Sequence, residues 1–344
     1  MYHYLNSNCT KEDWNSYVYR ALLYDFYHTW DYHFLTHNEG EPFMFIYEEN
    51  ENFIAVPFLR RRIEGTDYYD FTSVYGYVGP ISNLNFENLD PDFVKRFREG
   101  FHDFLIKENI VSVFSRLHPL IPQDLLLAEI GGLYDNGRTV AIDLKIPYED
   151  QRSQYRKDHR SKINQLRRKG FYAKEADSST ELKEFVRIYN ENMERVKASP
   201  YYFFDESYFL KLLHSKDFNT ILLLIYFEDQ ITAGSIFITS NNIMQFHLSG
   251  TNGKFLKEAP AKLMIDEATL VARDQKLDYL HLGGGLGGSE DSLFEYKSGF
   301  SNLYLNFKTW RYVVNQPIYN SLVLKKLNTL EHNGNVFPLY RTAI

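Results

Sequence analysis

The segment from Phe246 to Phe300 constrains the fold more tightly than any other part of the chain, because four elements with clear signals follow one another within it. An apolar strand comes first, followed by a loop and a helix whose first turn tolerates Pro260. Apolar residues at three- and four-residue intervals from Ala261 to Ala272 predict that helix. The short run Asp278 to Leu282 predicts a second strand, which leads into a glycine-rich turn.

The glycine-rich turn, GGGLGG over residues 283–288, does not match the common nucleotide-binding loops. A dinucleotide fingerprint requires G-x-G-x-x-G in a βαβ unit with an acidic residue about 20 positions on, and a P-loop requires G-K-[ST]. Since neither pattern is present, we expect these glycines to allow a sharp turn or a close approach to a ligand. Asp291 or Ser292 can cap the next helix, which carries Tyr296 and Lys297.

The predicted elements have the same order in both halves of the chain. The first half gives a helix over 11–35, a hairpin of strands 43–47 and 53–59, a strand over 68–78, a helix around 93–104, and strands 110–116 and 139–144. The second half gives a helix with capping-box spacing at Ser178 and Glu181, a helix after Asp205, and strands 220–227, 230–239 and 243–249. The helix over 261–272, the strand over 278–282 and the helix with Lys297 follow, and a strand near 303–313 comes last. This order predicts an α/β (α+β) fold with mixed sheets and helices on their faces. We expect an N-terminal lobe over residues 1–145 and a C-terminal lobe over 146–344.

Three motifs resemble a known family: APAKLMIDEA at 259–268, YLHLGGG at 279–285 and EDSLFEYKSGF at 290–300. They resemble the C-terminal half of the FemAB-type transferases, which are peptidoglycan aminoacyl ligases and relatives within the GNAT acyltransferase superfamily. The closer resemblance is to the GNAT-like branch found with polysaccharide synthesis. The resemblance implies two tandem GNAT-like lobes, each a mixed, mostly antiparallel sheet flanked by helices. It also implies transfer of an acyl or aminoacyl group to an amine.

Charge and composition exclude several other classes of protein. The formal net charge of -7 argues against a protein that coats nucleic acid, and we expect no DNA partner. Cys9 is the only cysteine, and no H-E-x-x-H motif is present, so neither a disulfide framework nor a metal site is expected. The N-terminus lacks a secretory pattern, and the longest apolar run, Ile221 to Phe227, is too short for a bilayer. These features predict a soluble, cytoplasmic protein without a transmembrane segment.

The segment 152–169, RSQYRKDHRSKINQLRRK, is the most basic part of an acidic chain. The spacing of Tyr155, His159, Ile163 and Leu166 predicts a helix with one thin apolar face at the junction of the lobes. Fem-like proteins carry a similar basic segment. Its cations can bind the phosphates of a tRNA, a nucleotide or a diphosphate lipid. A solvated helix face that anchors the junction explains the same residues, and the sequence leaves both interpretations open.

Lys297 is the first candidate for chemistry. In the Fem-like pattern a lysine lies in an F-K-x-x-F motif close to the reacting groups, and YKSGF matches it with Tyr296 in place of the first Phe. Acyl transfer to an amine requires a group that accepts the amine proton and a donor that stabilises the oxyanion. As a cation beside the glycines, Lys297 could stabilise that oxyanion or a substrate phosphate. The alternative is an exposed helix lysine.

His247 is the candidate general base, because its imidazole lies on the strand before the donor loop. Alternation along that strand places Ser249 on the same side as His247. Both His247 and His281 are also compatible with structural, half-buried roles, and Glu290 and Asp291 with helix capping. The candidates for substrate binding are Arg156, Arg160, Tyr75, Ser249, Gly284, Gly285 and Tyr296.

The sequence leaves two acyl donors open, aminoacyl-tRNA and acyl-CoA. Either would act as a co-substrate, and we expect no tightly bound cofactor. Acetyl-CoA enzymes of the GNAT type hold the pyrophosphate with an [RQ]-x-x-G-x-[GA] loop at a helix N-terminus, and GTNGKFLKEAP at 250–260 lacks that spacing. The departure favours the Fem-like donor. The expected acceptor is an amine of a cell-wall precursor or an amino sugar, held between the lobes. A rival hypothesis is a non-catalytic GNAT-like protein that binds a carbohydrate or a partner.

Overall fold

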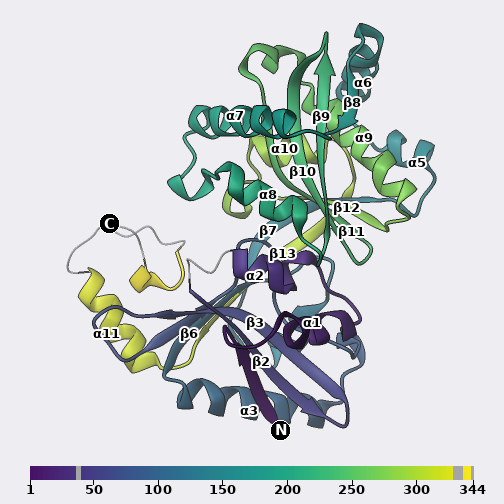
Figure 1. Ribbon diagram of the computed structural model, residues 1–344. Helices are drawn as coiled ribbons and strands as arrows, with labels where there is room; N and C mark the ends of the chain where they lie inside the picture. The colour runs from purple at the N-terminus through teal and green to yellow at the C-terminus, as the bar shows by residue number, and fades with distance from the viewer. Residues whose placement is uncertain (36–39, 328–335, 342–344) are drawn as a thin grey trace. The chain divides into compact units, whose positions relative to one another are not determined.

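The computed structural model describes residues 1–35, 40–327 and 336–341, and the chain forms two compact units (Figure 1). The first unit comprises Met1–Gly137 and Asn306–Ile344, and the second comprises Arg138–Leu305. The predicted lobes differ from these units at the C-terminus, because residues 306–344 belong to the first unit. The reason is that β13 (Leu303–Val313) pairs antiparallel with β6 (Ile110–Arg116). Within the described ranges, no helix combines the length and the apolar character that crossing a membrane requires.

The first unit is a sheet in the order β1-β2-β3-β4-β6-β13 with helices on both faces. Its remaining elements are β1 (Tyr2–Asn6), β2 (Glu41–Glu49), β3 (Asn52–Arg62), β4 (Tyr69–Thr72), β5 (Ile81–Ser82), α1 (Lys11–Arg20), α2 (Trp30–Leu35), α3 (Pro91–Lys107), α4 (Gln123–Ala128) and α11 (Gln316–Leu327). Alternation along β2 buries Phe43 and Phe45 against α3, and Met44 with α1. Phe101 is one of several α3 phenylalanines whose burial contributes roughly 1.5–3 kcal/mol each.

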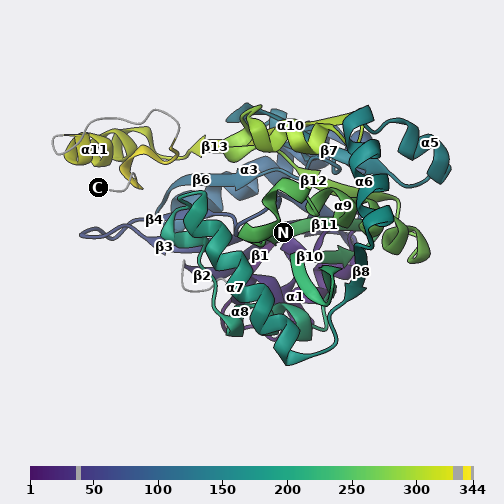
Figure 2. The same cartoon turned by 90° about the horizontal axis from the view of Figure 1, so that it is seen from above.

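The second unit is a sheet in the order β7-β12-β11-β10-β9-β8. Its strands are β7 (Leu133–Asp143), of which Arg138–Asp143 belong to this unit, β8 (Tyr172–Glu175), β9 (Asn219–Phe227), β10 (Gln230–Ser240), β11 (Ile243–Thr251) and β12 (Tyr279–Gly283). Its helices are α5 (Tyr148–Ser153), α6 (Lys157–Lys169), α7 (Ser179–Arg195), α8 (Glu206–His214), α9 (Ala261–Asp274) and α10 (Ser292–Ser298). Helices α6 and α9 cover one face of this sheet, and α7 and α8 cover the other (Figure 2).

Close packing explains two glycines under α7. A Cβ at Gly250 would lie 2.9 Å from Cα of Tyr189, and a Cβ at Gly234 would lie 2.6 Å from the Phe185 ring. The helix can approach the sheet this closely because both positions lack a side chain. The expected α/β (α+β) architecture, with mixed, mostly antiparallel strands and flanking helices, is confirmed in both units.

Three predicted elements were wrong in their extent. The helix over 11–35 is broken, because Ala21 is extended and the Asp25 side chain, accepting from the Phe26 N–H, starts a separate 3-10 turn. The strand over 68–78 ends at Thr72. The basic segment 152–169 is not one helix, because Arg156 is extended and donates its N–H to the Gly299 carbonyl at 2.9 Å. Tyr155 therefore precedes α6, while His159, Ile163 and Leu166 form its buried face as predicted.

Candidate functional site

Lys297 lies on α10, directly after the glycine-rich turn, and it is buried with 8% of its surface exposed. Helix α10 begins where the Asp291 carboxylate accepts hydrogen bonds from Leu293 N–H and Phe294 N–H, both at 3.0 Å. This cap was predicted. Nζ of Lys297 donates to the Gly284 carbonyl at 2.6 Å. The alternative of an exposed helix lysine is therefore wrong.

Burial gives the Lys297 ammonium an unusual acidity. Removal from water lowers its pKa from 10.5 to about 8, against a smaller opposing effect of the Asp291 carboxylate. An ammonium carries three N–H donors, and within the described residues Gly284 is its one hydrogen-bond acceptor. The group can donate to a developing oxyanion as a cation, and it can change protonation state near neutral pH.

The glycine-rich turn is packed on itself. A Cβ on Gly284 would lie 2.7 Å from the Arg138 carbonyl, and a Cβ on Gly285 would overlap the Ser289 carbonyl and the Asp291 carboxylate. The same carboxylate accepts from Leu286 N–H at 2.9 Å. The turn therefore needs glycine for internal packing, and Gly284 contributes a carbonyl that positions Lys297.

Strands β11 and β12 separate near this turn. Their parallel ladder covers Ile243 to Gln245 on β11 and Tyr279 to His281 on β12, whereas β11 continues to Thr251. Beyond Gln245, the side of β11 that faces away from β10 has no pairing with β12. Such backbone groups can pair with an extended ligand. Because the two strands are parallel, this part of β11 and the turn after β12 lie toward the same end of the sheet.

His247 occupies a β-bulge on β11. The register passes from Ile236 opposite Leu248 to Phe237 opposite Phe246, so His247 is the extra residue. A bulge interrupts the alternation of side chains between the two faces of a strand. The prediction that His247 and Ser249 lie on the same side of β11 therefore loses its basis. Burial lowers the pKa of His247 to about 3, so its imidazole is neutral at pH 7 and is a weak base.

His281 and Tyr296 have partners inside the second unit. The two ring nitrogens of His281 lie 2.8 Å from Oε1 of Gln245 and 2.9 Å from the Thr139 hydroxyl, and the residue is fully buried. The Tyr296 hydroxyl donates to the Ala261 carbonyl at 2.9 Å and ties α10 to the start of α9. These contacts account for both side chains as structural, and substrate binding by Tyr296 stays a prediction.

The basic segment is partly neutralised by α9. Arg152 and Arg167 approach the fully buried Asp266 carboxylate at 3.4 and 2.9 Å. Burial raises the pKa of Asp266, and the two guanidinium groups oppose that effect. Arg156 pairs weakly with Glu295, at 3.4 Å. The anchoring interpretation thus accounts for the inner arginines of the segment.

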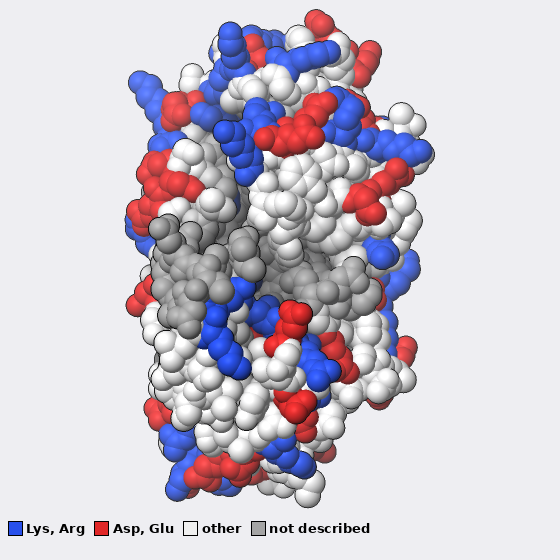
Figure 3. All heavy atoms as spheres, turned by 90° about the vertical axis from the view of Figure 1, so that its left-hand side faces the viewer, with Lys and Arg blue, Asp and Glu red and all other residues white. Residues whose placement is uncertain are grey.

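Asp266 was missed by sequence reasoning. The available signal was an acidic residue inside the apolar stripe of α9, between Ile265 and Ala268, about 100 residues from the arginines that it meets. Arg160 differs from those arginines: it is exposed, and its guanidinium donates to the Ser153 carbonyl at 3.4 Å. On the one face that Figure 3 shows, Lys and Arg are interspersed with Asp and Glu, and neither sign forms a continuous field.

Tyr75 lies in the first unit, where its backbone carbonyl accepts from the Tyr32 hydroxyl at 3.0 Å. The ring is half-buried, and its contact with an acceptor stays a prediction. Across residues 1–35, 40–327 and 336–341, no group of three or more His, Cys, Asp or Glu side chains is arranged to hold a metal ion.

Comparisons with known proteins agree with the fold and the motifs. Residues 153–298 match a family model described as an acetyltransferase (GNAT) domain. No curated protein matches the chain. Among solved structures, the chain is similar to the crystal structure of FemX, with a TM-score of 0.71 and 12% identity over 92% of this chain and 99% of that one.

Two further structures share the fold. One is the C-terminal domain of a putative lysylphosphatidylglycerol synthetase from Agrobacterium fabrum, with a TM-score of 0.54 and 12% identity over 95% of this chain and 98% of that one. The other is L-PGS from Bacillus licheniformis, with a TM-score of 0.52 and 15% identity over 81% and 87%. The second unit therefore contains a region that matches the GNAT acetyltransferase family, and the chain shares the fold of FemX over most of its length.

Proposed function

We propose that this protein is an N-acyltransferase that moves an aminoacyl group from aminoacyl-tRNA to an amine of a cell-wall precursor or an amino sugar. The observation that carries the proposal is the buried ammonium of Lys297, held against the Gly284 carbonyl with a pKa of about 8. Perturbed lysines in such positions are typical of functional sites. A fold shared with FemX and a putative lysylphosphatidylglycerol synthetase supports an aminoacyl group as the transferred unit.

The reaction forms a C–N bond between the acceptor amine and the acyl carbonyl carbon, and it breaks the bond from that carbon to the ribose oxygen of tRNA. Negative charge develops on the carbonyl oxygen, and a preorganised cation in a site of low dielectric stabilises it strongly. Lys297 donates one N–H to Gly284 and retains two for that oxygen. The amine proton finally resides on the departing ribose oxygen. His247 is the candidate carrier of this proton, although its pKa of about 3 makes it a weak base.

The separation between β11 and β12 supports a donor that carries its reactive carbonyl at the end of an extended chain, which is called the arm below. Beyond Gln245, the backbone of β11 can pair with such an arm and direct its carbonyl toward the turn after β12. Ser249 lies on this part of β11 and is the candidate side chain for contacting the arm.

The start of α9 favours aminoacyl-tRNA over CoA. The Lys262 N–H donates to the Ala259 carbonyl at 3.1 Å, and the Leu263 N–H donates to the Pro260 carbonyl at 3.0 Å. These two amides are therefore already satisfied, whereas the pyrophosphate of CoA would need unpaired N–H groups at a helix N-terminus. Phosphates of tRNA can instead meet Arg156 and Arg160, both of which are exposed.

The proposal is tested by a transfer assay with the purified chain. Charged tRNA carrying a radiolabelled amino acid is incubated with UDP-linked amino sugars, and label in the acceptor is measured. Lys297→Met should lower the rate by about 10²–10³-fold, the magnitude known for loss of one oxyanion donor. Lys183→Met, on the exposed surface of α7, is the matched control and should retain full activity.

Binding measurements separate the donors. Uncharged tRNA should raise the apparent stability by mass action, and charge-neutral variants at Arg156 and Arg160 should abolish that effect. A stabilisation by CoA or acetyl-CoA without one by tRNA would replace aminoacyl-tRNA with acyl-CoA as donor. If Lys297→Met binds substrates and transfers at the wild-type rate, the catalytic role of Lys297 is refuted. If the wild-type chain binds substrates but transfers no label, the enzyme proposal is refuted in favour of a binding protein.

A further inference from the structure

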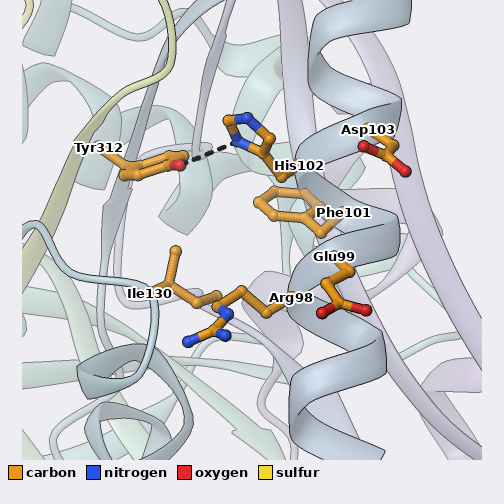
Figure 4. A pocket seen from close by; sticks show the side chains of 7 residues that line it. All are labelled: Arg98, Glu99, Phe101, His102, Asp103, Ile130 and Tyr312. Carbon is orange, nitrogen blue, oxygen red and sulfur yellow. Dashed lines mark hydrogen bonds between the residues drawn. The ribbon is translucent and has the colours of Figure 1, made fainter.

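A pocket of about 450 Å³ lies on the first unit, beside α3 (Figure 4). Helix α3 forms one side of it, and the other side is formed by Ile130, which follows α4, and by Tyr312 on β13. None of the residues considered above for acyl transfer lines this pocket. Its volume lies within the range of pockets that bind small molecules.

Polar groups converge on the pocket from opposite sides. Nδ1 of His102 lies 3.1 Å from the Tyr312 hydroxyl, and Figure 4 shows this pair across the space from Arg98. The Arg98 guanidinium donates to the Glu129 carbonyl at 3.2 Å, which is its one hydrogen-bond partner among the described residues. A guanidinium has five N–H donors in a planar fork, so Arg98 retains donors that suit a carboxylate.

The base of the pocket is apolar and rigid. Phe101 is 1% exposed, and its ring lies 5.7 Å from that of Trp310, which is fully buried. The Tyr312 ring also stacks on this indole, with the ring centroids 6.1 Å apart. Tyr312 and Ile130 are half-buried, and their accessible parts present an apolar surface to a side chain of a ligand.

Two carboxylates also line the pocket, and they decide the charge of the ligand. Glu99 and Asp103 are four residues apart and therefore neighbours on α3, just as Arg98 and His102 are. One guanidinium and two carboxylates make the lining net negative, which would repel a simple anion. A ligand that carries both a carboxylate and an ammonium can pair its carboxylate with Arg98 and its ammonium with Glu99 and Asp103.

We propose that this pocket binds a small zwitterion with an apolar side chain, namely an apolar α-amino acid. Arg98 receives the carboxylate, Glu99 and Asp103 receive the ammonium, and the side chain packs on Tyr312 and Ile130. The pocket lies in the first unit, so this binding is independent of the proposed transfer chemistry.

The test is calorimetric titration with L-phenylalanine, phenethylamine, which lacks the carboxylate, and N-acetyl-L-phenylalanine, which lacks the ammonium. We expect saturable binding of L-phenylalanine with a Kd near or below about 1 mM, and at least tenfold weaker binding of both analogues. Tryptophan fluorescence is a second readout, because Trp310 lies directly behind Phe101.

Variants identify the site. Arg98→Gln should weaken L-phenylalanine about tenfold, while Lys95→Gln, on the same helix but outside the pocket, should not change it. Glu99→Gln with Asp103→Asn should remove the preference for L-phenylalanine over its N-acetyl form. Lys297→Met should bind L-phenylalanine normally, which separates this proposal from the transfer proposal. Absence of saturable binding up to about 10 mM, or wild-type affinity in Arg98→Gln, would overturn the assignment.

Discussion

The buried charge of Lys297 predicts a specific effect of pH on stability. A solvated lysine has a pKa of 10.5 and Lys297 has one of about 8, and at 1.36 kcal/mol per pKa unit this interval corresponds to about 3 kcal/mol. Below pH 8 both the folded and the unfolded states are protonated, and the full cost of burying the charge is present. Between pH 8 and 10.5 the unfolded state binds more protons than the folded state, so stability rises with pH.

Replacing Lys297 with Met removes this dependence. Methionine carries no charge to bury, but it loses the charge-assisted hydrogen bond to Gly284, worth roughly 1.5–3 kcal/mol. The two effects nearly cancel at pH 7, whereas at pH 10 the wild-type chain should have gained about 2.5 kcal/mol relative to Lys297→Met. Taking the difference between the two proteins cancels every other group that titrates in this range.

The measurement is urea unfolding of both proteins at pH 7 and pH 10, followed by circular dichroism. Lys183→Met is the control, because Lys183 is exposed on α7, and its stability difference from the wild type should be the same at both pH values. The reasoning is refuted if the stability difference between the wild type and Lys297→Met changes by less than about 0.5 kcal/mol from pH 7 to pH 10. That result would mean that Lys297 is solvated.

Three other residues provide independent tests of the structure. Burial lowers the pKa of His33 to about 3, so lowering the pH from 7 to 5 should cost about 2 kcal/mol of stability, and His33→Gln should be less acid-sensitive in urea unfolding. Gly285→Ala should destabilise the chain by roughly 1–3 kcal/mol, because its Cβ meets the Asp291 cap, whereas Gly253→Ala has open space and should change the melting temperature little. Ser178→Ala removes a capping box and should cost about 1 kcal/mol, while Ser199→Ala, at a cap without a side-chain hydrogen bond, should cost much less; equal losses would contradict the cap.

Elements governed by neighbouring residues were predictable. The hairpin of β2 and β3, the capping box at Ser178 and the caps at Asp205 and Asp291 all follow the sequence, because each depends on residues within a few positions. The predicted strands and helices occur in the predicted order, but β1, α4, β8 and α11 were not predicted.

Features that depend on distant partners were not predictable. The break before α6 depends on the bond from Arg156 to Gly299, and the place of β13 depends on pairing with β6. The bulge at His247 appears only when β11 is set against β10. In each case a contact between residues far apart in sequence overrides the local pattern.

By itself, the sequence determined the hairpin of β2 and β3, the helix caps at Ser178, Asp205 and Asp291, and which motif carries the lysine of the candidate site. Only the tertiary structure decided that Lys297 is buried against Gly284 with a pKa near 8, and that Asp266 holds two arginines of the basic segment. The physical reason is that local pattern selects backbone conformation, whereas pKa and ion pairing depend on how much water the packed chain removes from each charge.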